Sequence, residues 1–437
     1  MLRNFVVLVM VASAPLLAPA PSAAQDQPLS ELIPRLYDQL ITAEATAFVT
    51  VLPEYGFSVD AGALTEQARQ RFEKETFPIV RLAGNQLSSF PVASASGGLT
   101  WTIDTASGAA RRTSNSFGPI FADRPLTIGR RRLNVGANFQ HVTFDHLEER
   151  SLRNGEVVGY LSVPLPGDNM FFANSLDLKV TTDTLNAFAT YGVTDRLDIG
   201  VAIPINRVDM EAKLTALIGL TSSGLLDIEP IETPLVSGTK TGIGDVMIRA
   251  KYNMFTNETW GIAESIDVRL PTGDELNLLG VAGPQVKLTF IASSAVGALS
   301  PHLNLAYTIS GSSAAGDDDG EIGENFIRAP PEEINYAAGA DLALSTRMTV
   351  AADLVGRVMR RAGTMTWAPA KFSGSQFPDY QQFDFIDGRD LHTLLGSVGL
   401  KVNPFKTMLF TANVLFPLTK NGLTDRLTWM AGIDYSF

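Results

Sequence analysis

The C-terminal segment, from Leu427 to Phe437, constrains the fold of this chain more than any other stretch. Large apolar side chains alternate there with small or polar ones, which is the period of two expected of a β-strand. The segment ends on an aromatic residue with no polar tail. An apolar strand at an open sheet edge promotes aggregation, whereas a strand in a closed barrel has two partners and turns its apolar face to lipid. The ending therefore favours a closed, membrane-spanning sheet.

The first residues predict export from the cytoplasm. Residues 1–24 combine one positive charge at Arg3, an uncharged apolar run over residues 5–17, and small residues just before Gln25. This order is typical of a secretory signal peptide. The apolar run is short and interrupted by prolines, which argues against the alternative of a transmembrane anchor. We expect cleavage near Gln25 and leave residues 1–24 out of the fold.

Composition narrows the class of protein further. The formal net charge is -12, and it becomes more negative when Arg3 is removed, which argues against nucleic acid as a partner. The chain has no cysteine, so disulfides cannot stabilise it. Beyond the leader, no run approaches the ~18 apolar residues of a membrane-spanning helix. The chain must therefore cross a membrane, if it does so, with strands.

Residues 25–130 differ from the rest and form the predicted N-terminal region. Residues 29–50 and 64–87 have helical spacing, and residues 97–113 could form a small hairpin. The region is too polar to lie in lipid. It is expected to be either a periplasmic element or a plug inside the barrel.

Residues 131–437 form the predicted barrel of about twelve strands, each near the ~10 residues that cross a tilted barrel wall. Short and long connectors alternate, as in bacterial barrels with short periplasmic turns and long outer loops. A soluble sandwich or repeat protein, the alternative, does not explain this alternation. The predicted strands are 131–145, 178–193, 196–210, 242–255, 260–270, 284–296, 301–310, 334–344, 348–360, 391–403, 407–418 and 427–437.

In several of these strands the charged residues share one parity and the apolar residues the other. A Lys or Arg on the lipid face costs ~2–4 kcal/mol near the bilayer midplane, so the charged set should face the lumen. Two interpretations stay open: a pore with a transverse field, or cross-strand ion pairs that fill a narrow interior. Glu264 breaks the pattern, and we expect a bulge or a position near the rim to accommodate it. The lumen-lining candidates are Asp245, Arg249, Lys251, Arg269, Lys287, Asp341, Asp353 and Arg357.

The other motifs give little indication of metal binding or catalysis. The acidic run at 316–321 lacks the residue order of a calcium loop, and four histidines are few for a metalloenzyme, so no metal or cofactor is expected. The chain has no Gly-x-Ser-x-Gly nucleophile motif. An outer-membrane enzyme of the lipase type, with His141 on the outer face, remains an alternative to a transport protein. A structural or adhesive barrel, working through long loops 145–177 and 361–390, is the third.

The chain also resembles known proteins at specific positions. Its C-terminus is similar to the assembly signal of bacterial outer-membrane barrels at Gly432, Tyr435 and Phe437. The segments 114–144, 191–204, 242–252 and 269–274 resemble the family of outer-membrane transporters associated with degradation of phenol and other aromatic compounds. This resemblance implies a barrel that passes small organic molecules, hydrophobic or aromatic ones among them.

The sequence thus predicts an all-β protein: a transmembrane antiparallel up-and-down β-barrel with a partly helical N-terminal segment. It should be a non-enzymatic channel of the outer membrane. The expected partners are outer-membrane lipid, the barrel assembly machinery and a small-molecule substrate, and not nucleic acid. If the N-terminal region plugs the lumen, Arg249, Lys251 and Arg357 are expected to pair with acidic residues of its second helix, namely Glu66, Glu73 or Glu75.

Overall fold

The computed structural model describes residues 27–51, 62, 65–66, 82, 84–87, 98–103, 110–112, 114, 116–165, 167–220, 224–225, 229–312, 330–369, 381–405 and 407–437. The leader 1–24, most of the second predicted helix and the acidic run at 316–321 lie outside these residues.

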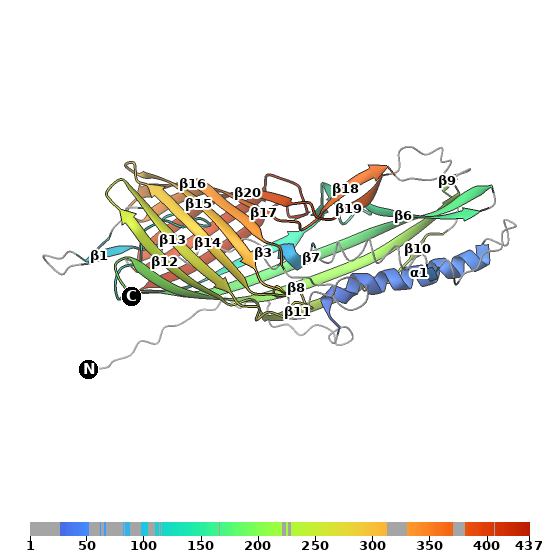
Figure 1. Ribbon diagram of the computed structural model, residues 1–437, viewed down its shortest axis with the longest axis horizontal. Coiled ribbons are helices and arrows are strands. Elements are labelled where there is room, and N and C mark those ends of the chain that lie inside the picture. The colour runs from blue at the N-terminus through green and yellow to red at the C-terminus, as the bar shows by residue number, and fades with distance from the viewer. Residues whose placement is uncertain are drawn as a thin grey trace.

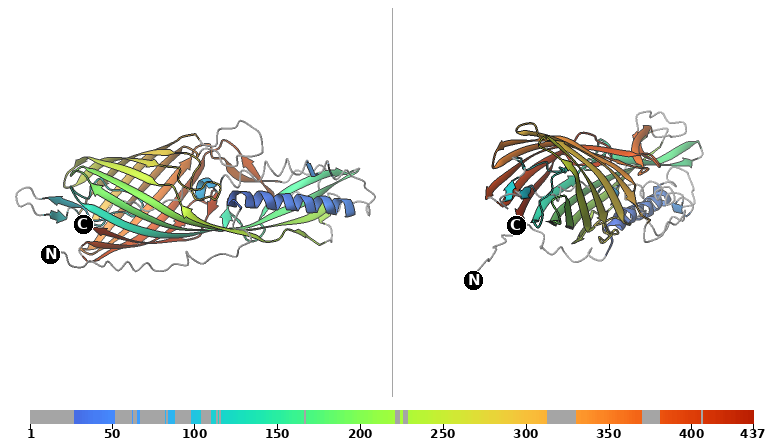
Figure 2. Two further views of the ribbon diagram at one scale, coloured as in Figure 1. Left: turned by 90° about the horizontal axis from the view of Figure 1, so that it is seen from below. Right: turned by 60° about the vertical axis from the view of Figure 1, so that its left-hand side comes forward.

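The main sheet closes on itself as an antiparallel barrel of twelve strands (Figures 1 and 2). Strands consecutive around the barrel are also consecutive along the chain, and the first barrel strand pairs with the last, so that Ala137 lies opposite Ile433. The predicted up-and-down barrel is confirmed. Its strands are β3 (Leu133–Phe144), β7 (Asp168–Gly192), β8 (Leu197–Leu220), β12 (Met247–Thr256), β13 (Trp260–Arg269), β14 (Gln285–Ser294), β15 (Leu299–Ser310), β16 (Glu333–Ser345), β17 (Met348–Met359), β20 (Leu391–Phe405), β21 (Met408–Pro417) and β23 (Thr428–Ser436).

The connections alternate between two rims. Short turns join β7 to β8, β12 to β13, β14 to β15, β16 to β17 and β20 to β21, and we call their end of the barrel the short-turn rim. The opposite end, the long-loop rim, carries small additional strands within its connections: β4 (His146–Leu147), β5 (Arg150–Ser151), β6 (Val157–Leu165), β9 (Gly224–Leu225), β10 (Ile231–Glu232), β11 (Val236–Ile243), β18 (Thr364–Pro369), β19 (Gln381–Ile386) and β22 (Leu423–Thr424). Phe437 ends the chain at the short-turn rim, marked C in Figure 1.

The wall has an apolar outer face and a polar inner face. In β15, Leu303, Leu305 and Ile309 are exposed on the outside, whereas His302 and Asn304 are buried inside. The predicted parity is confirmed in this strand. Aromatic side chains are also exposed on the outer face, as expected of residues at a membrane interface. They are Tyr191, Tyr252, Trp260, Tyr307 and Trp429.

Glu264 keeps its outward position, opposite Tyr252 and Phe290 on the neighbouring strands. The bulge lies in β12, between Asn253 and Phe255, and it does not turn Glu264 inward. The bulge prediction is therefore wrong for this residue. Glu264 is the fifth residue of the ten-residue strand β13, so it lies in the middle of the strand and not near a rim.

Strands β7 and β8 continue far beyond the other strands at the long-loop rim (Figure 1). On their outer face, apolar residues give way to polar ones just past the pair Leu185–Ile205, where Asp183 lies opposite Arg207. About nine residues of β8 thus span the apolar band, in agreement with the ~9–11 residues of a membrane strand. The rest projects about 50 Å along the strand. Residues 168–177 and 211–220, predicted as loop, are strand.

A helix covers the inner face of this extension. A turn of 3-10 helix, η1 (Leu29–Glu31), leads into α1 (Leu32–Val51), which lies along β8 in Figure 1. Ile33, Leu36 and Leu40 are buried at helical spacing against Leu214 and other alternate residues of β8. Burial of each such side chain contributes ~1.5–3 kcal/mol. The first predicted helix is confirmed, but it lies at the long-loop rim and neither in the lumen nor at the short-turn rim.

The predicted hairpin is also present in the N-terminal region. Strands β1 (Trp101–Ile103) and β2 (Ala110–Arg112) pair with each other beyond the short-turn rim, to the left in Figure 1. Among the described residues, no helix is both long and apolar enough to cross a bilayer.

Docking of α1 should weaken as the pH rises, because Glu44 lies in its buried face. Burial raises the pKa of Glu44 from 4.5 to about 8, and the nearby amide of Asn174 offsets only part of this. A carboxyl whose pKa is raised on docking favours the docked helix most at low pH, and the advantage is lost between its ordinary pKa and about 8. Hydrogen exchange of residues 32–46 should therefore be faster at pH 9 than at pH 6.

The variant Glu44→Gln should remove this pH dependence and slow exchange at pH 9, because an amide carries no charge to desolvate. Glu31→Gln, at an exposed position of the adjoining turn, is the matched control and should behave like the wild type. Equal exchange at the two pH values in the wild type, after correction for the intrinsic rate, would contradict this account.

Candidate functional site

An irregular segment, residues 116–128, lies inside the barrel at the short-turn rim, and we call it the plug segment. Nearly all of its residues are buried, although it forms no helix or strand. Phe117 packs with Leu99 and Leu409, and Ile120 packs with Met430, so it touches β21 and β23 through apolar contacts. Its polar contacts reach β8, β12, β16, β17 and β20, which means that it is held from most sides of the ring.

Two lysines of the wall bind main-chain oxygens of the plug segment. Lys251 donates from Nζ to the carbonyl of Leu126 at 2.9 Å, and Lys401 donates to the carbonyl of Pro119. Asn253 donates from Nδ2 to the carbonyl of Pro125 at 2.8 Å. An irregular backbone lacks the partners that a helix or sheet would supply, so these side chains satisfy it. Lys251 and Lys401 are both buried.

Carboxylates of the wall accept from the plug segment in the same way. Asp353 Oδ2 accepts from the main-chain N–H of Ile120 at 3.3 Å, and Asp198 Oδ2 accepts from that of Ile128 at 3.1 Å. Asp341 accepts from the hydroxyl of Ser116. Carboxylates of the wall thus accept hydrogen bonds from N–H and O–H groups of the plug segment, and lysines of the wall donate to its carbonyl groups.

Arg124 folds the plug segment back on itself. Its guanidinium donates to the carbonyl of Ser116 at 2.9 Å and to that of Gly98 at 2.6 Å. Gly118 makes this possible, because its φ is +78° and a Cβ there would lie 3.1 Å from Arg124 Nε. One side chain therefore joins three stretches of the N-terminal region.

Above the plug segment, towards the long-loop rim, lies a chamber that is open to solvent. Phe121 and Asp123 of the plug segment line it at the short-turn end. Its wall is a belt of inward-facing polar residues from β12 to β20, in the order in which they pair across strands. That belt includes Arg249, Asp267, Lys287, Thr308, Glu333, Asn335, Arg357 and Thr393.

Ion pairs run across this belt. Arg249 binds Asp267 through two hydrogen bonds and also meets Asp123 of the plug segment at 2.8 Å. Lys287 lies 3.4 Å from the same Asp267, and Arg357 lies 3.7 Å from Glu333. The charges are therefore paired across strands, and they also surround the chamber.

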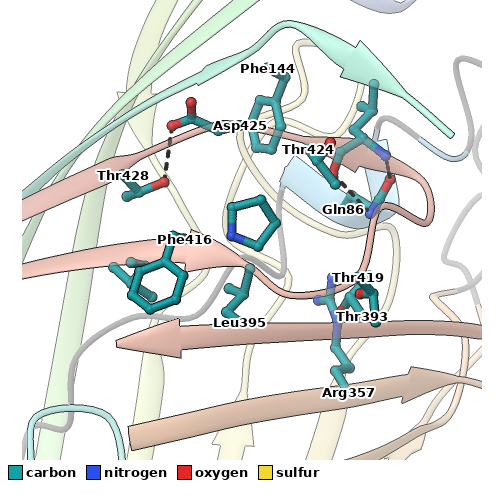
Figure 3. Close-up of a pocket in the computed structure, with 13 residues that line it drawn as sticks. Gln86, Phe144, Arg357, Thr393, Leu395, Phe416, Thr419, Thr424, Asp425 and Thr428 are labelled. Atoms are coloured by element: carbon teal, nitrogen blue, oxygen red, sulfur yellow. Dashed lines mark hydrogen bonds between the residues drawn. The ribbon is translucent and has the colours of Figure 1, made fainter. Parts of the chain in front are cut away.

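A smaller pocket adjoins the chamber on the long-loop side, and we call it the vestibule (Figure 3). Phe144 and Leu395 give it apolar walls, and Gln86 of the N-terminal region borders it, accepting from the main-chain N–H of Leu423. Arg357 lines both this vestibule and the chamber. The two spaces therefore meet at Arg357.

Asp245 organises the long-loop rim instead of facing the chamber. Its carboxylate accepts from the main-chain N–H groups of Gly273 at 3.0 Å and Val281 at 2.8 Å, and Arg269 lies 4.0 Å away. Asp245 and Arg269 belong to two of the segments that carry the family resemblance, 242–252 and 269–274. These two segments therefore form one structural unit that folds the loop 271–283 into the barrel mouth.

Apart from Asp245, which lies at the long-loop rim, seven of the eight lumen-lining candidates face the inside of the barrel, and the structure divides them by role. Lys251, Asp341 and Asp353 hold the plug segment, Arg269, Lys287 and Arg357 surround the chamber, and Arg249 does both. The pairing of these basic residues with Glu66, Glu73 or Glu75 stays a prediction, and the structure shows other partners for two of them. Arg357 pairs with Glu333, and Arg249 with Asp123 and Asp267, whereas Glu66 is exposed. Glu73 and Glu75 lie outside the described residues.

Sequence reasoning missed two groups of contacting residues. Lys401 has the inward parity of β20 and could have been found by the rule that placed the other lumen candidates. Ser116, Asp123 and Arg124 could not, because the plug segment has no periodicity from which a side-chain direction follows. In the described part of the chain, no group of acidic or histidine side chains is placed to hold a metal ion.

The proposed enzyme alternative depends on His141, which lies on the outer face just beyond the apolar band. Its Nδ1 lies 2.7 Å from Asp183, its Nε2 lies 3.4 Å from the hydroxyl of Thr143, and its ring stacks on Trp429. These polar groups satisfy one another where the apolar face ends, as expected for an interface girdle.

The assembly-signal candidates lie on the last strand. Tyr435 and Phe437 contact each other edge to face at 4.6 Å, and Phe437 is 59% exposed on the outer face. The main-chain N–H of Phe437 donates to the carbonyl of Leu133 at 2.7 Å, which extends the seam between β23 and β3. Gly432 lies within that seam, opposite Asn138.

Comparison with solved structures finds several outer-membrane proteins. An outer membrane channel from Pseudomonas putida F1 is 13% identical and aligns over 71% of this chain and 97% of its own, with a TM-score of 0.43. The monoaromatic hydrocarbon channel CymD is 8% identical over 72% of this chain and 91% of its own, with a TM-score of 0.33. The P. putida toluene transporter TodX is 8% identical over 72% and 92%, with a TM-score of 0.31. No curated protein matches the sequence.

One protein family matches the sequence itself. Its description is "Putative MetA-pathway of phenol degradation", and the match covers residues 156–353, from the start of β6 into β17. It includes three of the four segments on which the resemblance rests, 191–204, 242–252 and 269–274, and excludes 114–144. The resemblance to this phenol-degradation family is thereby confirmed over residues 156–353.

Proposed function

We propose that the chain is an outer-membrane channel for small organic molecules, hydrophobic or aromatic ones among them, and that displacement of the plug segment opens it. The observation that carries the proposal is the chemistry of the plug–wall contact. Its main anchors are Lys251, Lys401 and Asp353, which bind main-chain groups.

A polar contact of this kind suits a gate. When the plug segment leaves, water can replace each hydrogen bond that it made, so the net cost per bond is only ~0.5–3 kcal/mol. A plug held mainly by apolar packing would instead expose its core and the wall's core together. The chamber and the vestibule supply the remainder of a path from the long-loop rim, and the family description supports small aromatic compounds as cargo.

Bacterial barrels place their short turns in the periplasm, so we orient the plug segment and Phe437 towards the periplasm and α1 towards the outside. The barrel assembly machinery would recognise the terminal strand at Gly432, Tyr435 and Phe437. We assign no enzymatic activity: His141 is engaged by Asp183 and stacked on Trp429, which fits an anchoring role at the membrane interface.

Locking the plug segment to the wall should close the channel. A Cβ at Gly261 in β13 would lie 3.2 Å from the Cβ of Pro125, close to the ~3.5–4.5 Å of a disulfide. The chain has no cysteine, so Pro125→Cys with Gly261→Cys introduces a single pair. Solute flux into liposomes should fall to that of empty liposomes after oxidation and return after reduction. Each single variant is the control.

The opposite change should open the channel. Replacing Lys251 and Lys401 together by Met leaves plug carbonyls without their charged donors, and at about 1.4 kcal/mol per tenfold change the open fraction should rise at least ~10-fold. If flux is the same in the oxidised lock, the wild type and the double Met variant, the plug segment does not gate this barrel.

The role assigned to the terminal residue is tested by Phe437→Asp. A carboxylate would replace an exposed aromatic ring on the lipid-facing side, and the assembled fraction should fall several-fold. The measurement is the fraction of protein in membranes that migrates faster unboiled than boiled, since a closed barrel resists detergent until it is heated. Phe437→Tyr keeps the ring and should assemble normally. Normal assembly of the Asp variant would remove Phe437 from the signal.

A further inference from the structure

We propose that the chamber is a binding station for small organic anions, in particular carboxylates with a flat apolar body. This inference rests on the proposed channel function and names the class of substrate that the channel selects. Basic and acidic side chains of the chamber are nearly equal in number, so its net charge does not decide which solutes bind. The inference rests instead on which of these side chains are accessible to a solute.

Two cationic side chains of the chamber are more accessible than the carboxylates beside them. Lys287 and Arg269 are 33% and 22% exposed, whereas their carboxylate neighbours Asp267 and Asp245 are 2% and 3% exposed. Arg249 covers Asp267 on one side, and Lys287 covers it on the other. A solute in the chamber therefore meets a positive surface with its counter-charges behind it, and that surface attracts anions.

The two accessible cations are placed to act together. Lys287 lies opposite Asp267, and Arg269 lies opposite Gln285, so Lys287 and Arg269 are diagonal neighbours on adjacent strands. Diagonal positions are ~7–8 Å apart, within the reach of long side chains. Arg269 also donates to Gln285 Oε1 at 3.1 Å, which holds it on this face. One carboxylate can thus receive hydrogen bonds from an ammonium and a guanidinium at once.

The remaining lining favours an apolar body on that anion. Phe121, Met247, Val355 and Leu395 line the same chamber. The adjoining vestibule adds the apolar side chains of Phe144 and Leu395, together with polar groups that include Asp425, and Arg357 lies at the junction of the two spaces. A fully hydrated inorganic anion would gain nothing from these surfaces, whereas burial of an apolar ring against them is favourable.

Calorimetric titration of the full-length protein in detergent tests this directly, with benzoate as the probe and benzamide as its neutral counterpart. Benzoate should bind at least ~10-fold more tightly than benzamide, because it alone makes charge-assisted hydrogen bonds. Lys287→Gln should weaken benzoate binding by about the same factor and leave benzamide unchanged. Lys179→Gln makes the same charge change on the outer face of the β7 extension, and should have no effect.

Three results would overturn the proposal: equal binding of benzoate and benzamide, equal effects of Lys287→Gln and Lys179→Gln, or displacement of benzoate by inorganic phosphate at comparable concentration. Arg269→Gln gives a second test if Lys287→Gln does not give heat-modifiable, folded protein. Binding is measured without flux, so its failure is separate from failure of the channel function. A barrel that binds benzoate but shows no flux even with Lys251 and Lys401 replaced would contradict the channel alone.

Discussion

Closure of the barrel between β3 and β23 is the constraint on which the rest of the structure depends. Because every barrel strand has two partners, the backbone of the wall is satisfied and its outer face is left for apolar side chains. Closure at twelve strands also sets the width of the interior, between the eight-stranded barrel that side chains fill and the sixteen-stranded porin that stays open. An interior of this size needs either water or an inserted piece of chain.

The inserted piece determines which residues the lumen must contain. The plug segment has no regular structure, so its N–H and C=O groups cannot satisfy one another and must find partners in the wall. Lys251, Lys401 and Asp353 supply them from three different strands. Charged residues in this lumen are thus required by the irregular backbone at one end, and others line the chamber, which Phe121 and Asp123 of the plug segment border.

The contrast between the regular wall and the irregular plug segment explains which features could be predicted from the sequence. Parity alone places Arg249, Lys251 and Arg357 inside the wall, because lipid excludes them from the other face. Parity names partners only within the wall: Lys251 lies opposite Asp198, 3.8 Å away, but it also binds carbonyls of residues 124 and 126, in a segment without periodicity. The extension of β8 was missed for a related reason. Its pattern continues through Leu214 and Ile218, but a strand length taken from the bilayer ends before them, and their cover is a helix more than 150 residues earlier in the chain.

Arg249 connects the plug segment to the wall of the chamber. Its guanidinium holds Asp123 of the plug segment and Asp267 of the wall, and Asp267 is shared with Lys287. These four groups form one alternating line of charge, from the plug segment to the accessible surface of the chamber. In a space of low dielectric, a change at one end of such a line alters every pair along it. An anion that draws Lys287 away from Asp267 leaves that carboxylate to Arg249 alone, and a guanidinium bound more firmly to the wall holds Asp123 less. The contacts that keep the plug segment in place are therefore not independent of what occupies the chamber.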